Sequence, residues 1–350
     1  MKRFLTFIII TAMVSLTGCK AKSELVGLAV ADIESDDEEA AAEHLQQAAD
    51  AGEDEQLIAR AAGILAMKQG DYVEAVKQFE KAVSLAEGNV TELEFDISYY
   101  LMSAQQKAGL YDDSIQTCSA IIGLKPKDPE LYFIRGELNL EKGNYDDSIR
   151  DFNRAVDNCG EDPDMYIRIY EYLAGKGFDE AAQNYLDSAR SLSGKFTDFQ
   201  KGRLAFCAGD YELARDYLEK ARMSEEEGVI LYLGRTYEAL GDMSFAESLY
   251  STYVEKHPED GAVYNQLGLC RIEMEEYEKA LEAFEKGIES GSASVRQALL
   301  FNRVTACERM GDVEKAKKLI KEYVKEYPSD ADGNREERFL TQWDRFGDNN

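Results

Sequence analysis

The sequence predicts an all-α solenoid of about eight helix pairs, and three observations support this fold class. One pattern, seen most clearly in residues 70–82, returns along most of the chain. All five prolines fall at junctions between its copies, where a missing N–H does no harm, and no β-rich stretch interrupts them. A period of 32 to 39 residues is typical of solenoids, whose units bury their apolar faces against neighbouring units. The aromatic or apolar landmarks of the pattern are Tyr72, Tyr111, Tyr145, Phe178, Tyr211, Met243, Tyr277 and Val313.

The second helix of each predicted pair combines a small and a bulky residue on one face. Residues at i and i+4 lie on the same side of a helix, so one helix can approach at the small residue while the bulky one fills the gap. The small residues are Ala75, Ser114, Ser148, Ala181, Ala214, Ala246, Ala280 and Ala316. The bulky residues are Phe79, Cys118, Phe152, Tyr185, Leu218, Tyr250, Phe284 and Ile320.

The first helix of five pairs carries a glycine nine residues before the landmark. Glycine inside a helix costs roughly 0.5–1 kcal/mol relative to alanine, so its recurrence indicates a close helix crossing. Met102, Ile169 and Val304 take this position in other pairs, which we expect to lie slightly further apart. Glu275 replaces the glycine that ends its helix, and we expect that turn to form with a less relaxed backbone. The crossing glycines are Gly63, Gly136, Gly202, Gly234 and Gly268.

These units resemble the tetratricopeptide repeat (TPR), and the resemblance covers most of the chain because it recurs in eight units. It implies a right-handed superhelical solenoid of about eight to nine helix-turn-helix repeats. It also implies that the first helix of each pair lines a concave inner surface. The Asn, Lys and Arg pattern with which some family members bind a C-terminal carboxylate is not visible here.

Terminal elements are expected at both ends of the repeat array, because an end repeat would otherwise expose one apolar face. A degenerate unit, with Ala29, Ala41, Leu45 and Ala48 at repeat spacing, precedes the eight. A last short helix carries the apolar stripe Phe339, Leu340, Trp343 and Phe346. The predicted organisation is a leader at 1–18, a lipidated N-terminus and degenerate repeat at 19–55, the TPR solenoid at 56–330, and a capping helix and tail at 331–350.

The N-terminus has the features of an export signal. Lys2 and Arg3 precede an apolar run that is too short to span a membrane. The following residues 16–19, Leu-Thr-Gly-Cys, resemble the bacterial lipoprotein box. This resemblance implies cleavage after Gly18 and lipid attachment to Cys19, which would hold the protein on the outer side of the cytoplasmic membrane, or on an outer membrane if there are two. The alternative is an ordinary secretory signal.

The chain is strongly acidic. Without Lys2 and Arg3 it has 38 basic and 68 acidic residues, a net charge of −30. This balance argues against binding to nucleic acid or to anionic lipid through basic patches. It is compatible with a preference for basic partners, but we favour the simpler explanation that acidic faces only maintain solubility.

Signals for catalysis, metals or cofactors are weak, and we expect none of the three. Only two histidines occur, His44 and His257, and neither the HExxH nor the GxxxxGK(S/T) motif is present. Residues 330–337 loosely resemble a calcium loop, but their glycine is misplaced, so we expect a polar turn before the last helix. The cysteines other than Cys19 are too widely spaced to form a metal-ligand cluster. We expect these five to be reduced, with four serving as small packing residues: Cys118, Cys207, Cys270 and Cys307.

The predicted inner helices carry the most specific functional signal. Aromatic residues recur there in repeats two to five, followed by a more polar part. Because packed helices stand about 8–10 Å apart, the rings would form a ladder for an extended or helical peptide. The alternative is that these rings only pack against one another. The candidate groove residues are Tyr99, Phe133, Tyr166, Tyr170, Phe199, Arg203, Phe206 and Arg235.

Two functions of different classes follow from the sequence. The first is a lipid-anchored envelope scaffold whose groove binds a peptide or protein partner. The second is a surface lipoprotein that binds a solute or glycan, or hydrolyses one, with aromatic rings stacking on sugars. A closed pocket with convergent carboxylates would favour the second function, and an open groove the first.

Overall fold

The computed structural model describes residues 23–35, 37–86, 90–192, 194–224, 226, 228–291, 293–328 and 330–347. Within these residues the chain forms nineteen α-helices and no β-strand, which confirms the predicted all-α class. None of the helices described here has the length and apolar character needed to cross a bilayer. The chain divides into two compact units, one ending at Gly160 and the other beginning at Glu161.

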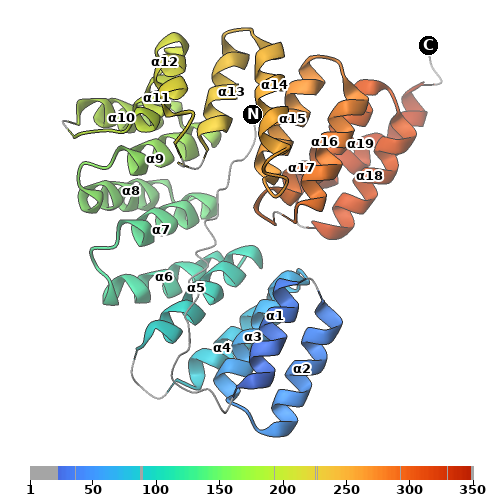
Figure 1. The fold of residues 1–350 in the computed structure, drawn as a ribbon. Coiled ribbons are helices and arrows are strands. Elements are labelled where there is room, and N and C mark those ends of the chain that lie inside the picture. Colours follow the sequence, from blue (N-terminus) through green and yellow to red (C-terminus); the bar gives the residue numbers. More distant parts are fainter. Residues whose placement is uncertain are drawn as a thin grey trace. The chain divides into compact units, whose positions relative to one another are not determined.

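The first unit consists of four helix hairpins, drawn from blue to green in Figure 1. The predicted degenerate unit forms the first hairpin, α1 with α2, and buries Ala29, Ala41, Leu45 and Ala48. The helices are α1 (Glu24–Glu34), α2 (Glu38–Ala51), α3 (Glu55–Lys68), α4 (Tyr72–Ser84), α5 (Glu92–Lys107), α6 (Tyr111–Leu124), α7 (Pro129–Lys142) and α8 (Tyr145–Cys159).

The second unit continues the same alternation and ends in a single helix. The first helices of its pairs are α9, α11, α13, α15 and α17; each contacts the next in this series, and we call them the inner helices. The last helix, α19, is the predicted capping helix. The helices are α9 (Pro163–Gly175), α10 (Asp179–Ser191), α11 (Asp198–Cys207), α12 (Tyr211–Ala221), α13 (Val229–Ala239), α14 (Met243–Val254), α15 (Gly261–Glu273), α16 (Tyr277–Glu289), α17 (Ala293–Met310), α18 (Val313–Glu326) and α19 (Ala331–Gly347).

The turn inside most hairpins follows from two residue types. A glycine in the left-handed region ends the first helix, as at Gly70 with φ 75°. The next residue is often an aspartate that caps the second helix, as where Asp71 accepts a hydrogen bond from the Glu74 N–H at 3.0 Å. Glu275 takes the glycine's place in one hairpin and has φ 61°, the one positive φ at a non-glycine residue in the described part of the chain. The predicted unrelaxed turn is thereby confirmed.

The predicted helix crossings are confirmed by what lies next to the five glycines. A Cβ added at Gly136 would lie within 3.0 Å of two ring atoms of Phe152, sixteen residues later. The same relationship holds for all five, so each inner helix approaches its partner over the bulky residue. The pairs are Gly63 with Phe79, Gly136 with Phe152, Gly202 with Leu218, Gly234 with Tyr250, and Gly268 with Phe284.

The repeat formed by α9 and α10 lies one residue later in the chain than the sequence analysis placed it. Phe178 is the N-cap residue and 37% exposed, and α10 begins at Asp179. Gly177, with φ 83°, occupies the left-handed turn position and sets the register. Our choice of Phe178 as the landmark of this repeat was wrong, because Asp179 takes the place that Tyr72 has in its own repeat.

The same shift moves the small and bulky positions of α10. Ala182 and Leu186 are fully buried, whereas Ala181 is partly exposed and Tyr185 retains a little exposure. Two adjacent alanines made both registers compatible with the pattern, and only the packing distinguishes them. The inner helix α9 shifts with its partner, which changes which of its side chains face inward.

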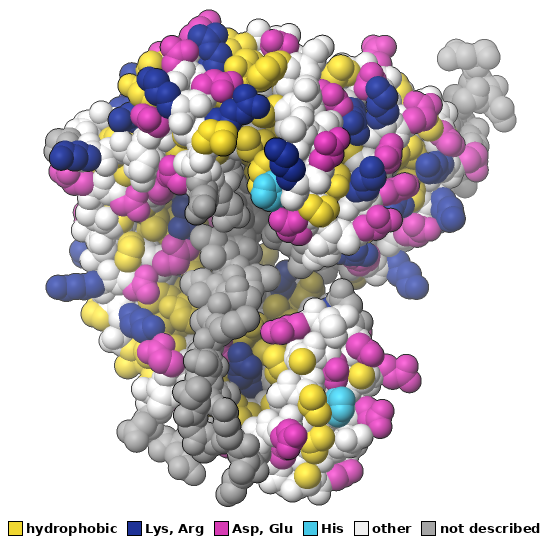
Figure 2. Space-filling model, viewed as in Figure 1, with side chains coloured by type: hydrophobic (Ala, Val, Ile, Leu, Met, Phe, Trp, Pro, Cys, Tyr) yellow, Lys and Arg dark blue, Asp and Glu magenta, His cyan; other side chains and the backbone are white. Residues whose placement is uncertain are grey.

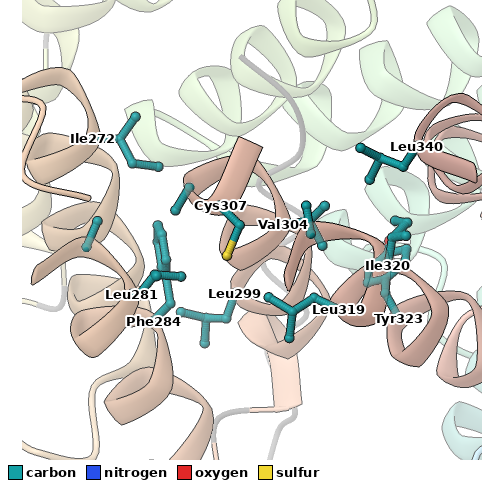
Figure 3. Packing of buried hydrophobic residues seen from close by; sticks show 13 residues of the cluster. Ile272, Leu281, Phe284, Leu299, Val304, Cys307, Leu319, Ile320, Tyr323 and Leu340 are labelled. Carbon is teal, nitrogen blue, oxygen red and sulfur yellow. The ribbon is translucent and has the colours of Figure 1, made fainter. Parts of the chain in front are cut away.

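The largest buried cluster joins α15 to α19 at the C-terminal end. Figure 3 shows Leu340 of α19 beside Ile320 and Tyr323, with Cys307 at the centre of the cluster. Leu340 is 1% exposed and so serves as the predicted cap. Phe339 is 50% exposed, which corrects its place in the buried stripe, because neighbouring helical residues point in different directions. The side chains of Trp343 and Phe346 lie outside the described part.

Candidate functional site

The eight predicted groove residues are divided between the two units, so they do not form one described site. Tyr99 and Phe133 belong to the first unit. Tyr99 is half-buried, and burial followed by the charge of Asp128 raises its pKa to about 12. Phe133 is 5% exposed and its ring centroid lies 5.7 Å from that of Phe152. Phe133 is therefore a packing residue of α7 and α8.

The remaining six predicted residues lie in the second unit, on α9, α11 and α13. Tyr166 and Tyr170 are half-buried and pack against the core of α9, α10 and α11. The Tyr170 hydroxyl donates a hydrogen bond to the Cys207 carbonyl oxygen at 3.1 Å, which joins two inner helices. Phe199 is 6% exposed and belongs mainly to the core, so the accessible ring of α11 is the half-buried Phe206.

Counting back from the turn glycines aligns three charged side chains. Glu171, Arg203 and Arg235 each lie six residues before a positive-φ glycine, in α9, α11 and α13 respectively. They therefore take the same place in successive inner helices. The opposite charges of the first two bring a guanidinium and a carboxylate together, with Arg203 Nη2 at 3.8 Å from Glu171 Oε2.

Arg203 is the most enclosed of the three. Its side chain is 12% exposed, and its Nη1 donates to Asp164 Oδ1 at 2.6 Å. Burial acts to lower the pKa of this guanidinium, but the neighbouring Tyr232, Glu171 and Asp164 outweigh burial and hold the pKa above its ordinary value. A charge-assisted pair of this kind also fixes the geometry of the guanidinium.

Aromatic rings surround the arginines. The guanidinium of Arg203 lies 5.1 Å from the centroid of the Tyr232 ring. Arg235 lies over Phe206, with its Cζ 4.8 Å from the ring centroid. Phe206 and Tyr232 meet edge to face at 5.5 Å, and Phe199 contacts Tyr232 at 5.8 Å. Such cation–π and edge-to-face contacts hold both guanidinium groups in place.

Tyr232 links the first and third of these helices. Its hydroxyl donates a hydrogen bond to Glu171 Oε1, across the intervening α11. Burial and then the charge of Glu171 raise the pKa of Tyr232 well above its ordinary value, so the phenol stays protonated as a donor. We call the following set the inner-face cluster: Asp164, Glu171, Phe199, Arg203, Phe206, Tyr232 and Arg235.

Sequence reasoning missed three members of this cluster. Glu171 was missed because α9 was placed one residue out of register, and counting from Gly177 would have found it. Tyr232 lies three residues before Arg235, so helical spacing could have placed both on one face. Asp164 has no signal in the sequence, because its role depends on the approach of Arg203 from another helix.

Polar side chains also join the helices beyond the cluster. Gln266 of α15 donates to both carboxylate oxygens of Glu238 in α13, at 3.1 and 3.0 Å. The side-chain amide of Asn302 in α17 donates to Asn265 Oδ1 in α15 at 2.8 Å. Polar side chains thus connect α13, α15 and α17.

Two cavities in the described part of the chain are lined by charged side chains. One of about 430 Å³ lies among α14, α15 and α16, where Lys286 pairs with Glu282 at 2.8 Å. The other, of about 270 Å³, lies among α6, α7 and α8, where Arg135 pairs with Asp151 at 2.6 Å. These carboxylates are in ion pairs. In the described ranges, no three potential metal-ligating side chains come together.

Acidic side chains do not gather in one patch on the face seen in Figure 2. Figure 2 shows Asp and Glu side chains scattered over the visible face, with Lys and Arg among them. The side chains in the inner-face cluster include two carboxylates and two guanidinium groups, so this part of the surface is close to electrically balanced.

Comparisons with known families identify the repeats. Models described as tetratricopeptide repeat match residues 27–90 and 101–163, residues 261–290, and residues 294–330, together more than half of the chain. No curated protein matches the sequence.

Solved structures show likeness of fold. A tetratricopeptide repeat protein from Parabacteroides merdae ATCC 43184 is 16% identical, with 70% of this chain and 97% of that chain covered and a TM-score of 0.44. MamA from Desulfovibrio magneticus RS-1 is 19% identical over 49% of this chain and 97% of its own, with a TM-score of 0.40. A human IFIT1 dimer with PPP-AAAA is 16% identical over 91% and 85%, with a TM-score of 0.44.

Proposed function

This chain belongs to the tetratricopeptide repeat family, and we propose that it is a lipid-anchored scaffold of the cell envelope that binds a peptide segment of a protein partner. The proposed binding surface is the inner face of α9, α11 and α13. Within it, the residues that contact the peptide are Tyr170, Phe206, Tyr232 and Arg235. Phe199 and Arg203 contact the Tyr232 ring and hold it in place.

The observation that carries this proposal is the stacking of Arg235 on Phe206 beside Tyr232. All three side chains are half-buried, so each is held by its neighbours and still exposes part of its surface to a ligand. Arginine and tyrosine are enriched among residues that dominate binding energy. Side chains already held in one geometry lose less conformational entropy when a ligand binds. This surface therefore has the composition and rigidity of a protein-binding site.

A paired substitution tests the binding surface. Full-length protein would be used to select binders from a random linear peptide library, and the affinity of the selected peptides would be measured. We expect Phe206→Ala with Arg235→Ala to weaken binding at least ~10-fold, because truncating an anchor residue commonly costs about 2 kcal/mol. The matched control is Glu180→Ala with Glu212→Ala, both exposed on outer helices. Equal effects of the two pairs, with helicity intact, would disprove this surface.

The membrane anchor is a separate part of the proposal. It rests on the sequence around Cys19, which lies outside the described residues. Cys19→Ala should leave the precursor uncleaved and prevent labelling by a fatty-acid analogue, since the thiol is the site of lipid attachment. Continued labelling of the variant would show that the anchor assignment is wrong, whatever the outcome for peptide binding.

The acidic balance leads to a proposal about the partner. A net charge of −28 should speed the encounter with a basic partner. Added salt screens this attraction and should slow the encounter. Association rates of selected peptides at low and high ionic strength would check this. We also propose that the protein does not bind nucleic acid, which a titration with labelled oligonucleotides would test.

A further inference from the structure

Glu238 lies next to the proposed binding surface, at the C-terminal end of α13. It is half-buried, and its hydrogen bonds come from the side chain of Gln266. Gln266 is itself only 8% exposed, and both of its contacts to the carboxylate come from one nitrogen atom. This carboxylate is therefore fixed by a neutral, buried amide from the neighbouring inner helix.

A second buried polar group points to the same place. Tyr250 belongs to the outer helix α14, is fully buried, and passes over Gly234 of α13. Its hydroxyl makes no hydrogen bond of ordinary geometry in the part of the chain that the structure describes. Burial, followed by the charge of Glu238 and a loose hydrogen bond to its carboxylate, raises the pKa of this phenol. The buried phenol is therefore a second neutral group, after Gln266, that faces the Glu238 carboxylate.

The charges around Glu238 favour a positive ligand. Burial raises the pKa of Glu238, and the charge of Glu273 on α15 acts in the same direction. Hydrogen bonds from Gln266 and Tyr250, and then the charge of Arg235, oppose this shift. The Arg235 guanidinium also lies over the rings of Phe206 and Tyr232. A cation that reaches the carboxylate would offset its desolvation and form a charge-assisted hydrogen bond, stronger than one to a neutral donor.

We propose that Glu238 receives a lysine or arginine side chain of the bound peptide, an inference that rests on the proposed binding surface. Arg235 and Glu238 are three residues apart on α13, so both lie on one side of the helix. A peptide that lies across Phe206 and Arg235 would meet Glu238 one or two peptide residues further along. The partner segment is thus basic at one defined position, directly beside the position that contacts the aromatic rings.

Peptide selection on full-length protein tests this assignment. Random linear peptides selected by the wild type should share a basic residue at one position. Glu238→Gln keeps the shape and removes the charge, so its selected peptides should lose that preference and keep the others. Glu212→Gln, an exposed change on α12, should keep every preference. If the peptides selected by Glu238→Gln keep the basic residue at the same position, Glu238 does not bind that residue. The proposed binding surface would be unaffected by this result.

A paired measurement covers the case in which Glu238→Gln selects nothing. The best wild-type peptide would be compared with its analogue in which norleucine replaces the basic residue. We expect the wild type to bind the analogue at least ~10-fold more weakly, because the desolvated ion pair is lost. Equal affinity for the two peptides would overturn the inference. A wild type that selects no common peptide at all would overturn both this inference and the proposed function.

Discussion

Gly234 of α13 lies directly against the ring of Tyr250 in α14, and there is no room for a side chain between them. A Cβ added at Gly234 would come within 3.0 Å of three atoms of that side chain, including its hydroxyl oxygen. The contact has two consequences. It brings the two helices of this repeat together, and it lets an outer-helix phenol reach the neighbourhood of an inner-face carboxylate, Glu238.

Gly234→Ala should therefore destabilise the protein by about 1–3 kcal/mol, because a crowded crossing must open to accept the methyl group. The damage should be confined to the neighbouring repeats, since each unit of a solenoid contacts only adjacent units. Hydrogen exchange resolved by residue would measure it. Gly123→Ala is the control, because a Cβ there meets no atom within 4 Å, and it should be neutral or stabilising by up to ~1 kcal/mol. Uniform loss of protection along the chain would contradict the prediction.

Glu275→Gly should stabilise the protein. Its φ of 61° is costly for a residue with a side chain, by roughly 1–2 kcal/mol, and glycine removes that cost. Glycine also makes the unfolded chain more flexible, which lowers the stability by about 0.4–1 kcal/mol. We therefore expect a net stabilisation of about 0.5–1 kcal/mol. Denaturant unfolding would measure the gain. The reverse change, Gly241→Glu at an equivalent turn, should lower the stability. If both variants are less stable than the wild type, the strain assigned to Glu275 is wrong.

The buried thiols should react slowly with alkylating reagents. Burial raises the pKa of Cys118 to about 12 and that of Cys270 to about 12. At pH 8 the reactive thiolate of each is then about 10⁻⁴ of the total. Mass spectrometry after timed alkylation should show the half-exposed Cys159 labelled first, and all five labelled together in denaturant. Rapid native labelling of Cys118 or Cys270 would contradict their burial.

The contact between α17 and the capping helix should weaken as pH rises. Burial, and then the hydrogen bond and charge of Glu336, raise the pKa of Glu308 from 4.5 to about 7. The folded state therefore holds an extra proton between these values, so the stabilisation is full below pH ~4.5 and is lost as the pH rises through about 7. Because the site is half-exposed, the effect should be on the order of 1 kcal/mol.

Glu308→Gln tests the titration directly. This variant should be more stable than the wild type at pH 8 and should show less change in stability between pH 5 and 8, as measured by denaturant unfolding. Glu314→Gln, whose side chain is 83% exposed on α18, should retain the wild-type pH dependence. If the Glu308 variant keeps that dependence as well, the carboxyl pair does not control it.

The repeat period, the crossing glycines and the strained turn at Glu275 could be predicted from the sequence because they are local. Each depends on spacing within one helix pair, and glycine has few reasons to recur inside helices other than close packing. The aromatic and arginine content of the inner helices was visible for the same reason.

Only the tertiary structure decided which of those inner residues form a site. Ala181 and Ala182 both fit the pattern of α10, and a difference of one residue there moves Glu171 on the partner helix onto the inner face. Helical pattern alone tolerates such a shift, because adjacent residues differ by about 100° around the axis. The contact of Tyr232 with Glu171 joins residues 61 positions apart, across an intervening helix. The sequence by itself therefore determined the repeating unit, whereas the packing of successive units determined which side chains meet.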